Sequence, residues 1–200
     1  MKKISLMAIA YAAMLMVSCS DRSKTADTAN TTENTDAKEA AKDSNENKFD
    51  TTAIHDDTKF AVSAADGGML EVELGKLALT KSKSTEVKNF AKMMVTDHAS
   101  SNEELKALSG KKNISIPAVL SNDRQEKIAD FVKKSDTDFD KDYISFMVKD
   151  HKDDIDLFKK EASDGKDADI KSWAASKVAI LEHHLEMAKN AEEVLKNKKK

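Results

Sequence analysis

Apolar residues recur every three to four positions from about residue 57 onward, which is the period of a helix that is buried on one face. This period predicts four long helices and one shorter helix, at about 58–82, 84–109, 137–162 and 168–196, with the shorter one at 121–134. No stretch alternates between apolar and polar residues as a half-buried strand does. The sequence therefore predicts an all-α protein.

The connecting segments predict how these helices pack. The first two long helices follow each other almost directly, and "SDGKD" (163–167) separates the last two, so each pair should form a hairpin. "SGKKNISIP" (109–117) breaks the second helix and opens a long link that contains the shorter helix. Two hairpins joined by one long crossover is the connectivity of ferritin-like bundles. We therefore expect a ferritin-like four-helix bundle over residues 57–197.

The N-terminal residues have the pattern of an export signal. Lys2 and Lys3 precede an uncharged apolar run at 4–17, which is too short to span a bilayer comfortably. The run leads to Cys19, the only cysteine, in a context that resembles a bacterial lipobox. We therefore expect a lipoprotein signal peptide at 1–18, with a lipid attached to the Cys19 thiol. A secretory signal without lipid attachment is the alternative.

The segment after Cys19 is expected to be a tether. Residues 20–48 contain no side chain more apolar than alanine, so they cannot bury enough surface to offset the entropy of ordering them. The prediction is a disordered, lipid-anchored segment over 19–56. Ser20 favours the outer membrane over the inner membrane of a bacterium as the place of anchorage.

Charge restricts the partners. The formal net charge is −3, and no cluster of lysine and arginine is flanked by aromatic residues, so nucleic acid is not expected as a partner. The membrane is the expected partner, through the lipid on Cys19. The sequence predicts no particular protein partner.

Three of the five histidines fall on the apolar face of a predicted long helix: His98, His151 and His184. Two of them end matching hexamers, "MMVTDH" at 93–98 and "FMVKDH" at 146–151. His183 falls at the edge of its apolar face. The three histidines on the apolar faces are therefore expected to meet inside the bundle.

Carboxylates accompany these histidines. On the first long helix, Glu73 is expected near the centre of the buried face with Asp66 beside it, whereas Glu71 is expected on a polar flank. Asp97 and Asp150 directly precede two of the histidines, and neighbours on a helix point 100° apart. These two aspartates are therefore expected to pair with lysines at the rim.

Several segments together resemble a known family: "FAVSAADGGMLEVELGKLALTKS", "VKNFAKMMVTDHASSNEELKALS", "FDKDYISFMVKDH" and "LEHHLEMA". In order and spacing they are similar to the bacterial domain of unknown function 4142, which is assigned to the ferritin-like superfamily. The resemblance covers about residues 58–195. It implies a ferritin-like four-helix bundle that is often exported or lipid-anchored, and it implies no established reaction. The matching polar positions are Glu71 or Glu73, Asp97–His98, Asp150–His151 and His184.

A di-iron centre is disfavoured. Ferritin-like di-iron sites use Glu-x-x-His on two helices. The third residue before each of the three histidines is Val95, Val148 or Leu181, so this pattern is absent.

A site for copper or zinc is the functional hypothesis, with Glu73, His98, His151 and His184 as ligands. Imidazole with a carboxylate suits zinc or copper(II), whereas added methionine sulfur suits copper(I). The second choices for ligands are Glu71, Asp66, Met94, Met147 and Met187.

Two other functions remain open. The first is a non-catalytic structural or interaction module of the outer membrane, in which the histidines form a hydrogen-bonded core without a metal. The second is an enzyme, which is less favoured because the sequence has no nucleophile motif and no glycine-rich phosphate loop.

Overall fold

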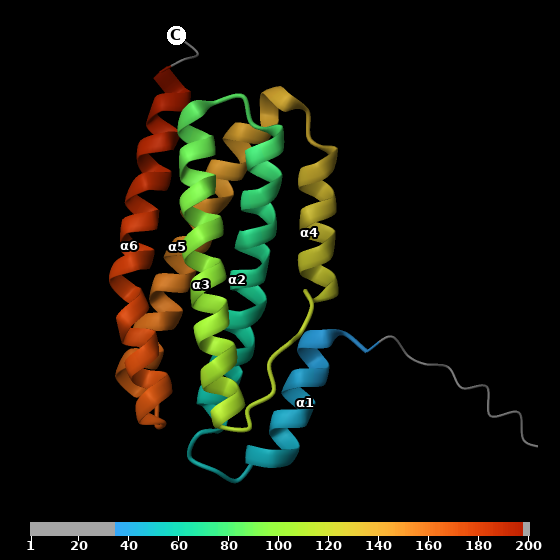
Figure 1. Ribbon diagram of the computed structural model, residues 1–200, viewed down its shortest axis with the longest axis vertical. Coiled ribbons are helices and arrows are strands. Elements are labelled where there is room, and N and C mark those ends of the chain that lie inside the picture. The colour runs from blue at the N-terminus through green and yellow to red at the C-terminus, as the bar shows by residue number, and fades with distance from the viewer. Residues whose placement is uncertain (1–34, 198–200) are drawn as a thin grey trace, which may run out of the picture. The chain divides into compact units, whose positions relative to one another are not determined.

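The computed structural model describes residues 35–197, which form six helices and no strand. The helices are α1 (Ala37–Phe49), α2 (His55–Lys81), α3 (Thr85–Lys111), α4 (Asn122–Lys133), α5 (Asp136–Asp164) and α6 (Ala168–Asn197). The four long helices α2, α3, α5 and α6 pack together as a bundle (Figure 1). The all-α prediction is confirmed, and five of the helices lie within a few residues of their predicted positions. None of the described helices is both long enough and apolar enough to cross a membrane.

The bundle consists of two antiparallel hairpins, α2 with α3 and α5 with α6. Helix α3 also packs on α6, and α2 packs on α5. In Figure 1, α2 rises, α3 descends, and the chain then climbs back along the bundle before α5 descends and α6 rises. Helix α4 lies in this climbing segment and packs on α2. One long crossover is a property of ferritin-like folds, and membership of that superfamily stays a prediction.

Helix α1 corrects the prediction of a disordered tether over 19–56. Asp36 caps the helix by accepting hydrogen bonds from two backbone N–H groups of its first turn. The Asn45 side chain donates to the carbonyl of Ser115 at 2.8 Å and accepts from its N–H at 2.7 Å. Polar contacts therefore hold α1 to the crossover, and Phe49 at its end packs against the apolar core. The predicted signal peptide at 1–18, Cys19 and the predicted tether up to residue 34 lie outside the described residues.

Local signals fix where the long helices begin and end. Ser84 and Ser135 cap α3 and α5, because each hydroxyl accepts a hydrogen bond from a backbone N–H of the first turn. Gly165 follows the last residue of α5. After α3, Asn113 adopts a left-handed conformation with φ of 57°, which asparagine tolerates better than most residues. This turn directs the chain from α3 into the crossover.

The core contains two apolar clusters. The first cluster includes Leu70, Leu74, Val87, Phe90, Met94, Phe139, Tyr143, Met147 and Ala188. The second includes Phe60, Ala64, Leu105, Ile155, Phe158, Ile170 and Leu181. Along each of α3, α5 and α6, a buried histidine stands between residues of the one cluster and residues of the other. A polar layer therefore crosses the bundle between two apolar parts of its core.

Candidate metal centre

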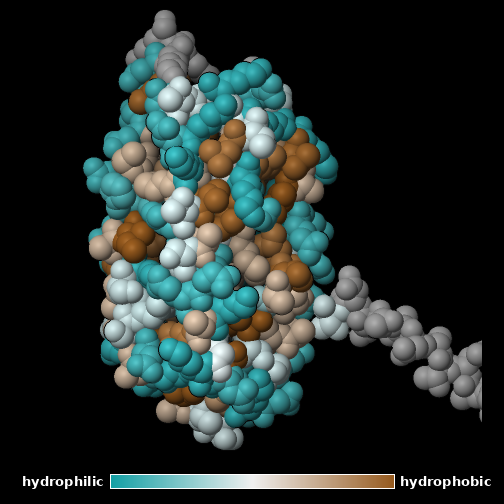
Figure 2. Space-filling model, viewed as in Figure 1, coloured by the Kyte–Doolittle hydropathy of each residue, from teal (hydrophilic) through white to brown (hydrophobic). Residues whose placement is uncertain are grey.

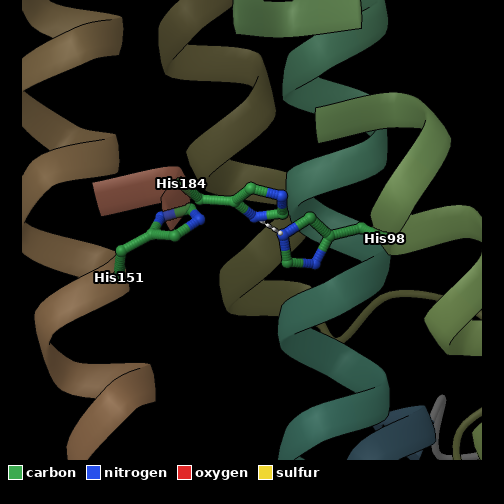
Figure 3. A group of neighbouring side chains, drawn as sticks. All are labelled: His98, His151 and His184. Carbon is green, nitrogen blue, oxygen red and sulfur yellow. Dashed lines mark hydrogen bonds between the residues drawn. The ribbon is translucent and has the colours of Figure 1, made fainter. Parts of the chain in front are cut away.

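The three histidines of the polar layer come from three helices and meet in the bundle interior. His98 of α3, His151 of α5 and His184 of α6 are 6%, 0% and 1% exposed. One ring nitrogen of each lies within 4.8 Å of the others. Figure 3 shows the three rings extending toward one another, with His98 Nε2 hydrogen-bonded to His184 Nδ1 at 3.2 Å. The structure thus brings the three predicted histidines together.

The other ring nitrogen of each histidine contacts an acceptor. These contacts join His184 Nε2 to Asp97 Oδ2 at 2.9 Å, His151 Nδ1 to the Met147 carbonyl at 3.0 Å and His98 Nδ1 to Glu71 Oε2 at 2.7 Å. Metal-binding histidines almost always direct their second ring N–H to a carboxylate or a backbone carbonyl, which fixes the tautomer and the ring orientation. All three histidines have this arrangement. The remaining nitrogens face one another, and an ion that replaced the hydrogen bond between His98 and His184 would find all three as ligands.

Burial keeps the three imidazoles neutral. Loss of solvent lowers the pKa of His98 to about 4 and that of His151 to about 3. It also lowers the pKa of His184, although the hydrogen bond to Asp97 acts in the opposite direction. A neutral imidazole has a lone pair available for a metal ion. At neutral pH the layer is therefore a set of nitrogen donors.

A hydrogen-bonded layer without a metal lacks one proton. Five contacts connect its groups: the three described above, the one between His98 and His184, and the one between Glu71 and His151. Three neutral imidazoles supply three protons and a protonated Glu71 supplies a fourth, so one of the five contacts has none. His151 Nε2 and Glu71 Oε1 lie 3.5 Å apart, and neither has a hydrogen-bond partner among the described residues. These two buried acceptors face each other.

A cation removes this shortage. If an ion takes the inner nitrogens, only the contacts to Asp97, Met147 and Glu71 still need protons, and three neutral imidazoles supply them. Buried polar groups without partners are costly, and each such group in a folded protein calls for an explanation. The donor set therefore fits a metal ion that prefers imidazole.

The carboxylate of this site is Glu71, and the prediction of Glu73 at the centre of the buried face is wrong. Glu71 is 1% exposed, whereas the Glu73 side chain is 45% exposed and pairs with Lys76 at 2.7 Å. Helix α2 is buried around most of its circumference, because α4 and the crossover cover its outer side. A single apolar stripe is a poor guide on such a helix. A better guide to the buried position of Glu71 is that small residues lie along the same line of the helix. These residues are Ala64, Gly68, Gly75 and Ala78.

Glu73 instead lines an apolar groove on the surface. This groove of about 630 Å³ lies between α2, α3 and residues 116–120 of the crossover. Figure 2 shows apolar surface between the α2–α3 hairpin and α4. The groove is therefore separate from the histidine layer.

The other second-choice ligands lie elsewhere. Asp66 is fully buried but accepts hydrogen bonds from the N–H and the hydroxyl of Ser121, so it holds the crossover to α2. Met94 and Met147 are fully buried in the first apolar cluster, and Met187 packs against that cluster. The structure brings only Glu71 of this second group into the histidine layer.

The aspartates beside the histidines also differ from the prediction that they pair with lysines at the rim. Asp97 accepts from His184. Asp150 lies with Asp154 and Glu71 in a group in which one carboxylate oxygen from each is within 4.8 Å of the others. Burial raises the pKa of all three carboxyl groups, and the negative charge of Asp150 adds to the increase at Glu71. Asp154 had not been singled out in the sequence, although its spacing from Asp150 places both on one side of α5.

Two small cavities adjoin His98, each of about 20 Å³. One is lined by Glu71 and Asp154 and the other by His184 and Lys177. Each has room for a water-sized species. These cavities therefore have room for a small ion beside the site.

Comparison with known proteins identifies the family of the chain but no individual relative. No curated protein and no solved structure matches the chain. The model of the family described as Domain of unknown function (DUF4142) matches residues 38–191, a range that contains all four long helices except the C-terminal end of α6, together with nearly all of α1. The chain therefore belongs to the DUF4142 family.

Proposed function

We propose that this chain is a metal-binding lipoprotein of the bacterial cell envelope that holds one zinc or copper(II) ion at His98, His151 and His184. The observation that carries this proposal is the orientation of the three rings. Each has one nitrogen held by an acceptor and the other directed to a common interior point. Neutral nitrogen donors with such outer partners are typical of zinc and copper sites.

The donor set favours zinc or copper(II) over copper(I). The methionines that could have supplied soft sulfur are packed in the apolar cluster, and the contact that Met147 makes with His151 is through its backbone carbonyl. Three imidazoles with a carboxylate nearby suit an ion of intermediate softness. When bound, the ion would supply the positive charge that the layer lacks.

The proposed role is binding or buffering of the metal, without turnover of a substrate. His151 and His184 are almost completely buried, and the adjoining cavities have room for little more than one water molecule. An organic substrate could not reach the ion in this conformation.

The test is the effect of the metal on the melting temperature. A ligand that binds only the folded state stabilises it by about 2.7 kcal/mol at one hundred times its dissociation constant, which corresponds to about 5–10 °C for a chain of this size. Zinc or copper should raise the melting temperature of the wild type by this amount. The same metal should have no effect on His98→Ala or His151→Ala. His183→Ala, which alters an exposed histidine next to the site, should respond as the wild type does.

The second candidate function is a structural module with a hydrogen-bonded histidine core. The hydrogen bond that His184 donates to Asp97 and the hydrogen bond between His98 and His184 favour it, because they need no ion. Equal melting temperatures with and without each metal, together with no metal retained after dialysis, would establish this alternative.

The envelope location in the proposal comes from the N-terminal sequence. A basic start, an uncharged apolar run and the single Cys19 support lipid attachment. Cys19→Ser should therefore move the protein from the membrane fraction to the soluble fraction. A variant that still sediments with membranes after a high-salt wash would exclude the lipid anchor.

A further inference from the structure

Glu71 belongs to two groups of ionisable side chains. Its Oε2 contacts His98, which is a ligand of the proposed histidine site. Its carboxyl group also lies within 4.8 Å of those of Asp150 and Asp154, one turn apart on α5. The two aspartates therefore face α2 from the neighbouring helix, beside the histidine layer.

One oxygen of the Glu71 carboxyl group, Oε1, lacks a hydrogen-bond partner among the described residues and lies 3.5 Å from His151 Nε2. Glu71 is 1% exposed, and its Oε1 accepts no hydrogen bond from any residue between 35 and 197. This oxygen has almost no exposed surface, and the neighbouring carboxyl groups are acceptors when they are ionised. A buried acceptor among acidic neighbours indicates a missing positive group.

A positive residue near this group forms an ion pair with another carboxylate. Arg124 lies near enough to act electrostatically on Glu71, Asp150 and Asp154. Its Nε, however, is 3.6 Å from Asp66 Oδ2, with which it forms an ion pair. This guanidinium is therefore not a dedicated partner of the three carboxyl groups.

There is also space beside the group. The cavity of about 20 Å³ that Glu71 and Asp154 line is also lined by Ser101 and Asn102, which carry neutral oxygen atoms. The absence of a side chain at Gly68 makes room for the Asn102 amide, because a Cβ there would overlap Asn102 Oδ1. The cavity has the size of one water molecule or one small ion.

We propose that Glu71, Asp150 and Asp154 bind a second, hard divalent cation, next to the histidine site and linked to it through the carboxyl group of Glu71. Carboxylate oxygens suit manganese, magnesium or calcium, whereas the imidazoles suit zinc or copper. The chain would then hold two ions of different chemistry. This second site goes beyond the proposed histidine site, and its test does not depend on zinc.

The test is a titration with Mn²⁺, followed by electron paramagnetic resonance of the free ion, with and without one equivalent of zinc. The full chain with Cys19→Ser serves as the background, because it removes the only thiol. This protein should bind one Mn²⁺ per chain. Asp150→Asn and Asp154→Asn should each weaken the binding at least about tenfold. Asp156→Asn, an exposed change on the same helix, should bind Mn²⁺ as the background does.

The results separate the two sites. His151→Ala should lose the zinc-dependent rise in melting temperature and keep its affinity for Mn²⁺, whereas Asp154→Asn should do the reverse. No binding of Mn²⁺ by the background protein, with or without zinc, would overturn the second site and leave the histidine site standing. Unchanged affinity in both aspartate variants would also overturn it. Binding of Mn²⁺ without any response to zinc or copper would instead reject the histidine site alone.

Discussion

Asp66 and Glu71 are both buried carboxyl groups on α2, yet they differ in their hydrogen-bond and ion-pair partners. Asp66 accepts two hydrogen bonds from Ser121 at 2.9 Å and pairs with Lys38 of α1 and Arg124 of α4. Glu71 contacts one histidine through Oε2, its Oε1 has no hydrogen-bond partner in the described part of the chain, and its other neighbours include two aspartates.

The difference separates a structural carboxylate from a candidate ligand. Groups of the protein itself satisfy Asp66, which thereby fastens α1, α4 and the crossover to α2. The layer around Glu71 has more acceptors than protons, so a positive species would complete it. Buried polar atoms are usually satisfied within the protein, and an exception among titratable groups points to function.

Replacement of Asp66 is expected to have the largest effect on the free energy of unfolding. Asp66→Leu leaves the Ser121 N–H, Lys38 and Arg124 without their shared partner, so we expect the free energy of unfolding to fall by about 3–5 kcal/mol. Urea denaturation measures this loss. Asp66→Asn keeps an acceptor oxygen and should lose less. Zinc should raise the melting temperature of both variants as it does that of the wild type, and a loss below about 1 kcal/mol in Asp66→Leu would show that Asp66 is not a structural anchor.

Replacement of His151 is expected to change stability little but to abolish the response to zinc. Leucine has a similar volume and no unpartnered lone pair, so metal-free His151→Leu should differ from metal-free wild type by less than about 1.5 kcal/mol in its free energy of unfolding. The zinc-dependent rise in melting temperature should vanish. A large loss of stability without any metal would mean that His151 is held by the protein as firmly as Asp66 is.

The pH dependence of stability sharpens this comparison. Folded metal-free protein keeps His151 neutral down to about pH 3 and His98 down to about pH 4, whereas in the unfolded chain histidine takes up a proton near pH 6.5. Between these values the unfolded state holds more protons, so these histidines make stability fall as the pH is lowered from 6.5 toward 4. The raised pKa values of Glu71, Asp150 and Asp154 act in the opposite direction, because the folded state then binds protons more tightly.

Comparing variants isolates the contribution of the histidine. Urea denaturation of metal-free protein between pH 7 and pH 4 should show a smaller acid-induced loss of stability in His151→Leu than in the wild type. Equal losses in the two proteins would show that His151 does not stay neutral in the folded state.

The smallest effect is expected at His183. This side chain is exposed beside His184, so His183→Ala should change the free energy of unfolding by no more than about 0.5 kcal/mol. A larger change in urea denaturation would indicate that the histidine layer extends to the surface of α6.

Much of the fold could be predicted from the sequence, because its long helices carry a regular apolar period. The position of His98, His151 and His184 on the apolar faces of α3, α5 and α6 was enough to predict that they meet. Helix α1 could not be predicted in this way. It is attached through Asp36 and Asn45, whose partners lie far along the chain in the crossover.

The carboxyl partners of the histidines were harder to predict. The choice between Glu71 and Glu73 depended on how many neighbours α2 has, and the sequence of α2 does not reveal that its outer side is covered. Asp97 reaches His184 across the contact between α3 and α6, which depends on the relative rotation of the two helices. Such contacts between helices follow from packing, which the period along one helix does not determine.

The most direct test of the histidine site is X-ray absorption at the zinc edge of the Cys19→Ser chain loaded with one equivalent of zinc. We predict a first shell that includes nitrogen at about 2.0 Å, with the outer-shell scattering of three imidazoles. His98→Ala and His184→Ala should each reduce that imidazole scattering. A zinc ion surrounded by oxygen alone, or a protein that loses all its zinc on dialysis, would contradict the proposal that the three histidines bind a metal.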